Sequence, residues 1–320
     1  MQVSFVIPLL NNLALTRACV ESLLATMPRG LAYEIILVDD GSTDGTRAWL
    51  ATLPPSFRVI LNERNLGYAV ANNRAVALAQ GKYLALLNSD LVLLSHWLDR
   101  MLSAHRSLGA RAGLVGNVQH HFRTGEVDHT GIIINRYGKP EHDRTPPSRV
   151  VTFFRPVRRV PAVTGACLLL DRAVWDKLGG FDEAYVNGGE DIELCFRARA
   201  AGLVNAVALR SVVRHHVSPS IGRKLHDEKN SFLLTRRWHR EFVAAADLAT
   251  RAWCRDYLTS IELDPRLADP VLARRAWFYA HRLSPTPPPE AVADLETALD
   301  REFTRWEKMF GGAPPPGRSP

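Results

Sequence analysis

The sequence predicts an α/β protein in which a Rossmann-like, mainly parallel sheet is flanked by helices and followed by a helical C-terminal extension. In the first 120 residues, apolar runs of strand length alternate with stretches of helical periodicity. Several apolar runs end abruptly in acidic residues, which is typical of buried strands that deliver side chains to a cleft. From about residue 226 onward the apolar spacing is helical.

The N-terminal elements alternate regularly. Strands are expected at residues 3–8, 34–40, 57–62 and 82–90, and helices at 15–27, 44–53, 68–80 and 95–108. Ser42 or Asp44 is expected to cap the second helix, and Gly81 is expected to end the third at its C′ position. This order predicts a parallel sheet that binds ligands at the C-terminal ends of its strands.

The pattern changes after residue 117. Residues 118–160 are rich in Gly, Pro, His and Arg, and we expect a functional loop or lid with one short strand at 131–134. Further elements are expected in the order strand, helix, helix, strand, at 163–171, 172–178, 190–202 and 204–209.

These elements predict a division of the chain into domains. A catalytic-type domain is expected at 1–225, with halves at 1–117 and 118–225. A helical region at 226–310 and a disordered tail at 311–320 follow it.

The composition, with 46% apolar and 23% charged residues, is that of a soluble globular protein. No apolar run approaches the ~18–20 residues that span a bilayer, and the N-terminus lacks the features of a signal peptide. We therefore expect a cytoplasmic protein, either free or peripheral on the inner face of the membrane. The four scattered cysteines contain no CxxC pair and favour reduced, buried thiols over a disulfide framework or a zinc site (Cys19, Cys167, Cys195, Cys254).

The net charge of +7 favours an anionic partner. The excess lies in residues 136–160, which hold seven Arg and Lys, and in residues 221–240, which hold six. A solvated surface, a phosphate-bearing substrate and a membrane face all remain open. Nucleic acid is disfavoured because no recognition helix, zinc finger or aromatic RNA-binding motif is present.

Acidic residues cluster where the predicted strands end. Asp39 and Asp40 follow the second strand, Asp90 follows the fourth, and Glu190 and Asp191 begin a later helix. The ends of neighbouring parallel strands lie together, so a shared cleft is expected. Hard cations such as Mg²⁺ bind one or two carboxylates together with substrate phosphates, and a separate carboxylate can act as a general base.

Five segments in this order resemble the family 2 glycosyltransferases, which have the glycosyltransferase A fold. They are VSFVIPLLNN, ILVDDGSTDGT, NERNLGYAVANN, LALLNSD and TGACLLLDRAVWDKLGGFDEAYVNGGEDIELCFRARAAG, within roughly residues 2–222. The stretches GEVDHTGIIINRYGKPEH and HHVSPSIG look most similar to the branch that builds bacterial surface polysaccharides, including rhamnosyltransferase-like enzymes.

The resemblance implies a nucleotide-sugar site. Asp39 would hydrogen-bond the base and Asp40 would lie near the ribose and phosphates, while Pro8 and Asn11 would line the nucleotide pocket. Leu10 departs from the family, which often has an aromatic residue there, so stacking on the base is lost or supplied elsewhere. Four residues would lie beside the diphosphate and sugar: Arg64, Asn65, Gly67 and Asn72. For Asn72, a polar helix face is a nearly equal alternative.

The resemblance also implies a metal site and a base. Asn88, Ser89 and Asp90 occupy the place of the Asp-x-Asp motif, with Asn88 in place of the first aspartate. Asp90 would bind Mn²⁺ or Mg²⁺ with His215, for which His216 is the alternative.

The acceptor side of the sugar pocket would be lined by Gly165 and Ala166. Asp191 would be the general base, with Glu190 in support.

The predicted function is therefore an inverting, metal-dependent glycosyltransferase of bacterial surface polysaccharide synthesis. Its donor would be a UDP- or dTDP-sugar and its acceptor a glycan or a polyprenyl-diphosphate-linked glycan. A nucleotide-dependent oxidoreductase is disfavoured because neither GxGxxG nor GxxxxGK occurs. A protein that binds nucleotide sugars or glycans without turnover remains the alternative.

Overall fold

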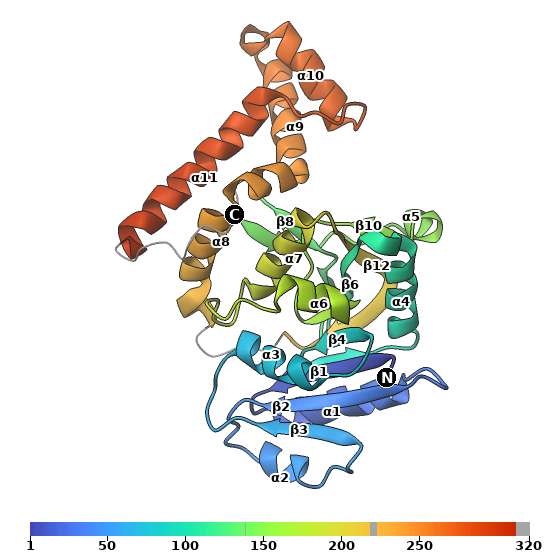
Figure 1. The fold of residues 1–320 in the computed structure, drawn as a ribbon. Coiled ribbons are helices and arrows are strands. Elements are labelled where there is room, and N and C mark those ends of the chain that lie inside the picture. The colour runs from blue at the N-terminus through green and yellow to red at the C-terminus, as the bar shows by residue number, and fades with distance from the viewer. Residues whose placement is uncertain (138, 218–222, 312–320) are drawn as a thin grey trace. The chain divides into compact units, whose positions relative to one another are not determined.

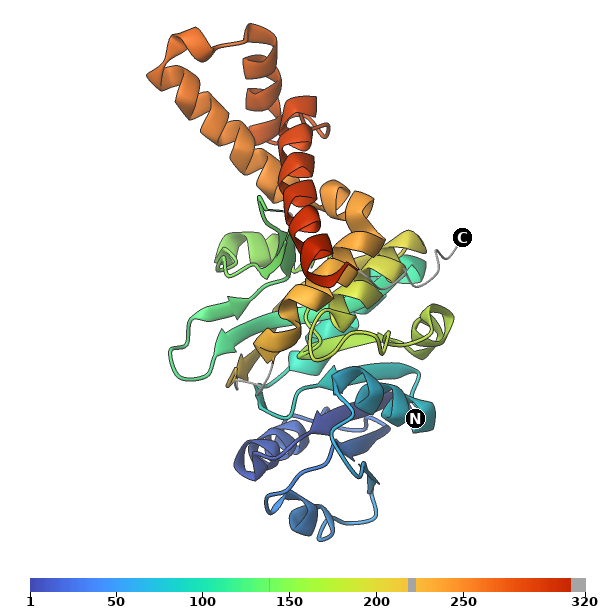
Figure 2. The same ribbon diagram turned by 90° about the vertical axis from the view of Figure 1, so that its left-hand side faces the viewer.

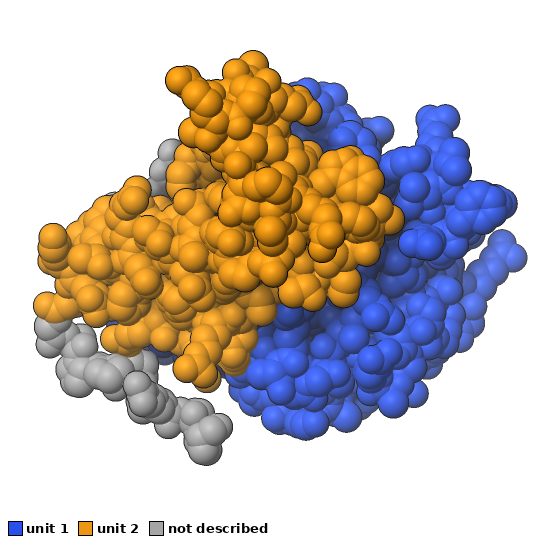
Figure 3. Space-filling view, turned by 90° about the horizontal axis from the view of Figure 1, so that it is seen from above, with its two compact units in different colours: residues 1–132, 142–226 blue, residues 133–141, 227–320 orange. Residues whose placement is uncertain are grey.

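The computed structural model describes residues 1–137, 139–217 and 223–311. The chain forms two compact units, coloured separately in Figure 3. Unit 1 comprises residues 1–132 and 142–226, and unit 2 comprises residues 133–141 and 227–320. The segment 133–141 therefore belongs with the C-terminal helices, which the sequence did not indicate. The predicted tail at 311–320 lies outside the described residues except for Gly311.

Unit 1 is built on one sheet with helices on both faces (Figure 1, Figure 2). Along the sheet the strands are β10 (Val157–Arg159), β12 (Val204–His215), β6 (Ala112–His121), β11 (Cys167–Asp171), β4 (Tyr83–Leu87), β1 (Val3–Leu9), β2 (Tyr33–Asp39) and β3 (Phe57–Leu61). Two short strands extend it: β5 (Leu91–Leu93) pairs with β12, and β7 (Val127–His129) pairs with β6. The predicted α/β class is confirmed.

The sheet is mixed rather than mainly parallel. The four strands β3, β2, β1 and β4 are parallel, as the βαβα order predicts, and β6 and β12 are also parallel to each other. β11 lies between these two groups and is antiparallel to both β4 and β6. Strand direction after residue 118 was not readable from the sequence, because an apolar run specifies burial and not direction.

Two apolar cores cover the faces of the sheet. Successive residues of β1 point to opposite faces of the sheet. Phe5 and Ile7 pack on the face covered by α1 (Leu13–Ala25) and α4 (Trp97–Leu108). Val6 packs on the opposite face, which is covered by α3 (Tyr68–Leu78), α6 (Arg172–Leu178) and α7 (Glu190–Ala200). This double burial explains why the inner strands are continuous apolar runs. All four cysteines are buried.

Gly81 does not end a helix, so its predicted C′ role is wrong. α3 ends at Leu78, and Ala79 already has an extended backbone with φ −66° and ψ 144°. A Cβ atom on Gly81 would lie 2.5 Å from the backbone nitrogen of Ser4. The Gly81 N–H also donates to the Ser4 hydroxyl at 2.8 Å. The glycine therefore allows the chain to cross closely beside β1.

Of the two predicted caps near α2 (Thr46–Leu50), only Asp44 contacts the helix start. Its Oδ1 accepts a hydrogen bond from the Thr46 N–H at 2.9 Å, although Gly45 is the N-cap residue. Ser42 instead accepts from the backbone N–H of Asn11 at 2.7 Å. The helix itself is shorter than predicted.

Residues 118–160 contain more regular structure than predicted. Beside β7 and β10 they include β8 (Ile132–Ile134), β9 (Pro140–His142) and the short helix α5 (Arg149–Phe154). β10 is held by β12, and β8 pairs with β9. These elements are only three to six residues long, too short for periodicity to reveal.

His129 is a buried histidine in this region with a depressed pKa. Its side chain is fully buried, and neither ring nitrogen has a hydrogen-bond partner among the described residues. Burial lowers its pKa well below the ordinary value, and the nearby His142, Arg158 and His215 add to the effect. The His142 ring lies 4.7 Å away, centre to centre.

His129 should make the protein less stable in mild acid. Below about pH 6.5 the unfolded chain takes up a proton at this residue and the folded chain does not, so the free energy of unfolding falls by up to about 1.4 kcal/mol per pH unit. Above that pH the penalty is absent. The His129→Leu variant should show a flatter pH dependence between about pH 7 and pH 5 in urea unfolding. An unchanged slope would show that His129 is protonated in the folded state.

Unit 2 consists mainly of helices. They are α8 (Arg223–Ala245), α9 (Asp247–Leu263), α10 (Pro270–Ala280) and α11 (Pro289–Phe310), with non-helical backbone geometry at Trp238 within α8. Asp247 joins α9 to α10, because Arg251 and the Tyr279 hydroxyl both bond to its carboxylate, at 2.8 and 2.7 Å. No helix among the described residues is both long and apolar enough to cross a membrane.

Candidate active site at the carboxyl ends of β1, β2 and β4

The loop after β1 is tied to the loop after β2 through Asn11. Its backbone is left-handed, with φ 56°, and its Oδ1 accepts a hydrogen bond from the Thr43 N–H at 2.8 Å. Pro8, which precedes this loop, pairs with Val38 across the parallel strands. Leu10 is 37% exposed. Pro8 and Asn11 thus lie at the predicted sheet edge, with Asn11 fixing the shape of the DDGSTDG turn.

Asp39 is fully buried and has protein partners at its carboxylate. The Ser42 N–H approaches both oxygens, at 3.2 and 3.3 Å, and Arg47 Nε lies 2.7 Å from Oδ2. Arg47 also donates to the backbone carbonyl of Asn62. The Asp39 carboxylate therefore holds Arg47 between the ends of β2 and β3. The contact of Asp39 with the base of a nucleotide stays a prediction.

Asp40 organises the loop that follows β3. Its Oδ1 accepts from Asn62 Nδ2 at 2.8 Å and from the Leu66 N–H at 2.9 Å. Its Oδ2 accepts from the Gly67 N–H at 2.9 Å. Gly41 allows the close approach: it has φ 90°, and a Cβ there would lie 2.7 Å from the carbonyl carbon of Arg64.

This loop presents exposed polar side chains and leads into α3. Arg64 and Asn65 are exposed, and Gly67, with φ 92°, is the N-cap residue of α3. Asn72 is fully buried; its Nδ2 donates to the Tyr68 carbonyl at 2.8 Å, while its Oδ1 is buried without a hydrogen-bond partner in the described structure. Arg64 and Asn65 are therefore available to a ligand, whereas Asn72 lies inside the fold.

The Asn-Ser-Asp tip after β4 meets the segment before β11. Cys167 pairs with Leu87 across the antiparallel strands, and the Asn88 N–H donates to the Ala166 carbonyl at 2.8 Å. Ser89 and Asp90 are only partly exposed. Beneath the tip, burial and the nearby Asp90 raise the pKa of the Cys19 thiol to about 12, which keeps it neutral.

Asp90 and His215 lie together, as predicted. His215 Nε2 is 3.1 Å from Asp90 Oδ1, and both side chains are nearly buried. β5 and β12 bring them together, because His215 is paired with Leu91. The alternative ligand, His216, stacks its ring on Phe122 at 3.8 Å between centres.

The pair fits a divalent cation that shares its ligands with a phosphate. No group of three His, Cys, Asp or Glu suited to hold a metal occurs among the described residues. Mg²⁺ and similar ions bind through one or two carboxylates plus phosphate oxygens and water, and imidazole suits the transition metals. His215 Nδ1 is buried without a protein partner in the described part of the chain. The donor set therefore suits Mn²⁺ or Mg²⁺ when a diphosphate completes it.

Asp191 lies in the first turn of α7 and holds the segment before β11. Its Oδ2 accepts from the Gly165 N–H at 2.6 Å, and its Oδ1 accepts from the Ile192 N–H at 2.8 Å. A Cβ atom at Gly165 would lie 3.1 Å from the Tyr68 hydroxyl, a tight contact. Both predicted acceptor-side residues, Gly165 and Ala166, thus lie between Asp191 and the tip after β4.

Tyr68 belongs to this site, and the sequence did not single it out. Its hydroxyl donates to the Gly165 carbonyl at 2.7 Å, and its backbone N–H donates to Asn187 Oδ1 at 3.2 Å. Burial, followed by the charges of Glu190 and Asp191, raises the pKa of the phenol well above its usual value. Tyr68 therefore stays a hydrogen-bond donor. Its position directly after Gly67, at the first turn of α3, was the available signal.

Glu190 closes the turn that leads into α7. Its Oε2 accepts from the Gly188 N–H at 2.7 Å, and the side chain is buried. Asn187, Gly188 and Gly189 all have positive φ, which explains the two glycines in the sequence. Glu190 thus holds the backbone turn directly before Asp191, and its support of a general base stays a prediction.

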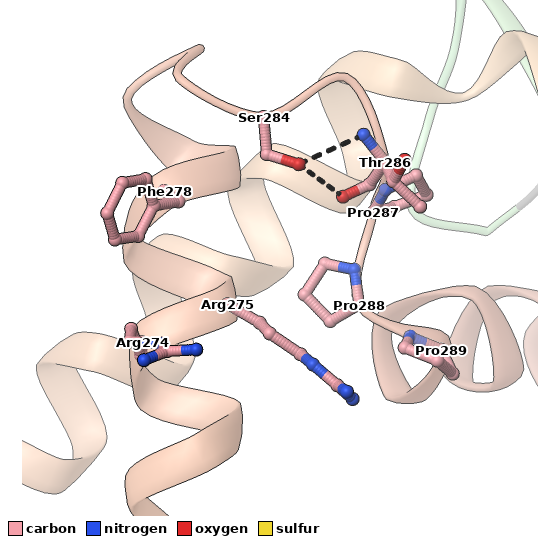
Figure 4. A pocket seen from close by; sticks show the side chains of 8 residues that line it. All are labelled: Arg274, Arg275, Phe278, Ser284, Thr286, Pro287, Pro288 and Pro289. Carbon is pink, nitrogen blue, oxygen red and sulfur yellow. Dashed lines mark hydrogen bonds between the residues drawn. The ribbon is translucent and has the colours of Figure 1, made fainter.

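Unit 2 contains a separate cavity of about 570 Å³ (Figure 4). Its lining comes from α10 and from the loop before α11: Arg274, Arg275, Phe278, Ser284, Thr286, Pro287, Pro288 and Pro289. The Ser284 hydroxyl is used by the loop itself, since it bonds to the N–H and carbonyl of Thr286. The cavity has no carboxylate in its lining, so it offers neither a general base nor a hard-metal site.

Residues 4–179, more than half of the chain, match the family described as Glycosyl transferase family 2. The chain therefore belongs to this family of glycosyltransferases, and the resemblance found in its sequence motifs is confirmed.

The chain is also similar to curated bacterial proteins. It is 33% identical to the O-antigen biosynthesis protein RfbC of Myxococcus xanthus over 227 residues, which are 68% of this chain and 18% of RfbC. It is 28% identical over 211 residues to an N-acetylglucosaminyl-diphospho-decaprenol L-rhamnosyltransferase of Mycobacterium tuberculosis, covering 59% of this chain and 68% of that protein. The chain thus spans less than a fifth of the length of RfbC.

The fold is that of the glycosyltransferase A enzymes. The structure is similar to that of GalNAc-T7, solved with UDP, GalNAc and Mn²⁺, with a TM-score of 0.60 and 17% sequence identity. The superposition covers 97% of this chain and 56% of GalNAc-T7.

Proposed function

We propose that this protein is an inverting, metal-dependent glycosyltransferase that uses a UDP- or dTDP-sugar. The acceptor would be a hydroxyl of a glycan or of a polyprenyl-diphosphate-linked glycan in bacterial surface polysaccharide synthesis. The relatives support this class of acceptor, because one of them acts on a diphospho-decaprenol-linked sugar. The Mn²⁺ and UDP of GalNAc-T7 support the donor and the metal.

One observation carries the proposal. The hydrogen bond from the Asn88 N–H to the Ala166 carbonyl, 2.8 Å long, joins the tip that ends in Asp90 to the segment held by Asp191. The candidate diphosphate site and the candidate base are therefore neighbours at one end of the adjacent strands β4 and β11. A transferase needs this proximity, because the acceptor hydroxyl and the leaving diphosphate flank the same anomeric carbon.

In the proposed reaction Asp191 accepts the proton of the acceptor hydroxyl. The hydroxyl oxygen bonds to the anomeric carbon while the bond from that carbon to the phosphate oxygen breaks, and the nucleoside diphosphate leaves from the opposite face. Asp90 and His215 would hold the divalent cation, which stabilises the negative charge of the leaving diphosphate when bound. Arg64, exposed in the loop that Asp40 holds, would contact the same charge. Gly165 and Tyr68 fix the position of the Asp191 carboxylate.

A donor-binding screen tests the proposal. Calorimetry with Mn²⁺ or Mg²⁺ and a panel of UDP-, dTDP- and GDP-sugars should show metal-dependent binding of one nucleotide class. The Asp90→Ala variant should bind this donor at least about tenfold more weakly, since loss even of a residue behind a metal ligand costs that much. Asp256→Ala, which removes an exposed carboxylate of unit 2, is the matched control. If no nucleotide sugar binds with either metal, the proposal is wrong.

A further inference from the structure

α5 is a short helix that exposes an apolar surface. The exposed fractions of Val150, Val151, Phe153 and Phe154 are 68%, 51%, 67% and 75%, and no residue of the helix is buried. The helix lies at the margin of unit 1, beside β10 (Figure 1). Two adjacent, largely exposed phenylalanines next to two exposed valines form a contiguous patch, and such patches on soluble domains mark interaction sites.

The apolar side chains share one side of the helix. At about 100° per residue they span an arc of about 160°, and Thr152 lies opposite. Thr152 is less exposed than they are, and Arg210 donates to the carbonyls of Thr152 and Phe153, at 3.2 and 2.6 Å. The body of unit 1 therefore holds the helix mainly by its backbone. The Arg210 guanidinium also lies 5.6 Å from the centre of the Phe153 ring, but that side chain remains 67% exposed.

Arginines flank this helix in the sequence. Residues 144–160 contain five arginines and no aspartate or glutamate. Two of the arginines pair with carboxylates elsewhere in unit 1, Arg144 with Asp128 and Arg158 with Asp143. The other three are exposed and have no ion pair among the described residues: Arg149, Arg155 and Arg159.

An exposed apolar arc within a segment that has arginines and no acidic residue is complementary to an anionic bilayer, whose apolar interior lies beneath negative head groups. A second copy of the chain would oppose the patch with the same positive charge. The patch is also a single helix of six residues, well short of the roughly 800 Å² per partner in a stable protein interface.

We propose that α5 docks unit 1 onto an anionic lipid bilayer. The side chains of Val150, Val151, Phe153 and Phe154 enter the interface, and the three unpaired arginines contact lipid phosphates. The docking proposal rests on the proposed function in one respect, because a polyprenyl-linked acceptor explains why a glycosyltransferase would work at a membrane. Lipid binding itself requires no turnover, so the two proposals can fail separately.

Vesicle flotation of the full chain tests the apolar contacts. The protein should float with vesicles of phosphatidylcholine and phosphatidylglycerol and much less with phosphatidylcholine alone. The Phe153→Ser/Phe154→Ser variant should bind the mixed vesicles at least about tenfold more weakly, because each buried phenylalanine contributes that order of affinity. Leu263→Ser is the matched control, since Leu263 is 83% exposed at the end of α9 in unit 2. It should bind as the unmodified protein does.

A second variant tests the contacts between the arginines and the lipid phosphates. Changing Arg149, Arg155 and Arg159 to glutamine should lower binding to the mixed vesicles by roughly tenfold or more and should weaken its salt dependence. A control with the same net charge changes three exposed arginines elsewhere to glutamine: Arg29, Arg255 and Arg301.

Three outcomes would overturn the docking proposal: no binding of the unmodified protein to the mixed vesicles, unchanged binding of the double phenylalanine variant, or equal losses with its control. A change of sedimentation coefficient in that variant would assign the patch to self-association instead. Thermal unfolding should be nearly unchanged, since both phenylalanines are largely exposed, and Phe154→Ser alone provides a milder variant. Calorimetry should show that the double variant binds the donor as the unmodified protein does. This measurement reports on the proposed function separately from lipid binding.

Discussion

The Asp191→Asn variant should lose about two to four orders of magnitude in turnover while it binds the donor normally. Asparagine keeps the size of the side chain and one hydrogen-bond acceptor for the Gly165 or Ile192 N–H. It has no basicity, so the acceptor hydroxyl must attack without transferring its proton to this group. Losing one of the two backbone contacts should cost only about 1–2 kcal/mol of stability.

Two assays separate these effects. Release of the nucleoside diphosphate, measured by a coupled assay at saturating donor, reports turnover, and calorimetry reports donor binding. Asp176→Asn is a suitable control, since Asp176 is a solvent-exposed carboxylate on α6. Turnover within a few-fold of the unmodified protein would rule out Asp191 as the base. Donor binding without turnover in the unmodified protein, with every acceptor, would favour a non-catalytic binding protein.

The Asp40→Asn variant should destabilise the protein by about 3 kcal/mol and weaken donor binding. The Asp40 carboxylate accepts three hydrogen bonds from the loop after β3 and is nearly buried. A carboxamide places its N–H₂ group against at least one of these N–H donors. Two donors then face each other in the interior, and neither has an acceptor. The loop that carries Arg64 and leads into α3 would then lose its anchor.

Urea unfolding and donor calorimetry measure both parts of this prediction. Glu63→Gln is the matched control, because it neutralises an exposed carboxylate of the same loop. If Asp40→Asn keeps full stability and loses donor binding, then Asp40 contacts the ligand directly. If it keeps both, the three hydrogen bonds contribute little to the fold.

The first half of the fold was predictable because its signals are local. The strands β1 to β4 are continuous apolar runs, and their parallel order follows from the helices between them. The acidic residues at their ends were therefore placed correctly at one edge of the sheet. Gly81 shows the limit of a local signal. Its position in the sequence suggested a helix end, but a glycine is required there because the backbone of Ser4 lies too close for a side chain.

The pairs that form the candidate site depend on contacts distant in the sequence. The hydrogen bond from Tyr68 to Gly165 spans 97 residues. The position of Tyr68 directly after Gly67 could draw attention to the residue, but it does not indicate Gly165 as its partner. Asp90 and His215 were paired through the resemblance to a family, since no spacing rule connects them. The antiparallel direction of β11 and the strands within 118–160 depend on β6 and β12, which are themselves placed by tertiary packing.

The pairing of β5 with β12 has a consequence for the growing chain on the ribosome. The strands β1 to β4 can associate once Leu87 has emerged, but Asp90 has no His215 to meet until β12 has been synthesised and inserted beside β6. Contacts so distant in the sequence form late and slow the final step of folding. A nascent chain that stops before β12 therefore has the parallel strands β1 to β4 but only one of the two candidate cation ligands. The complete pair arises only near the end of the synthesis of unit 1.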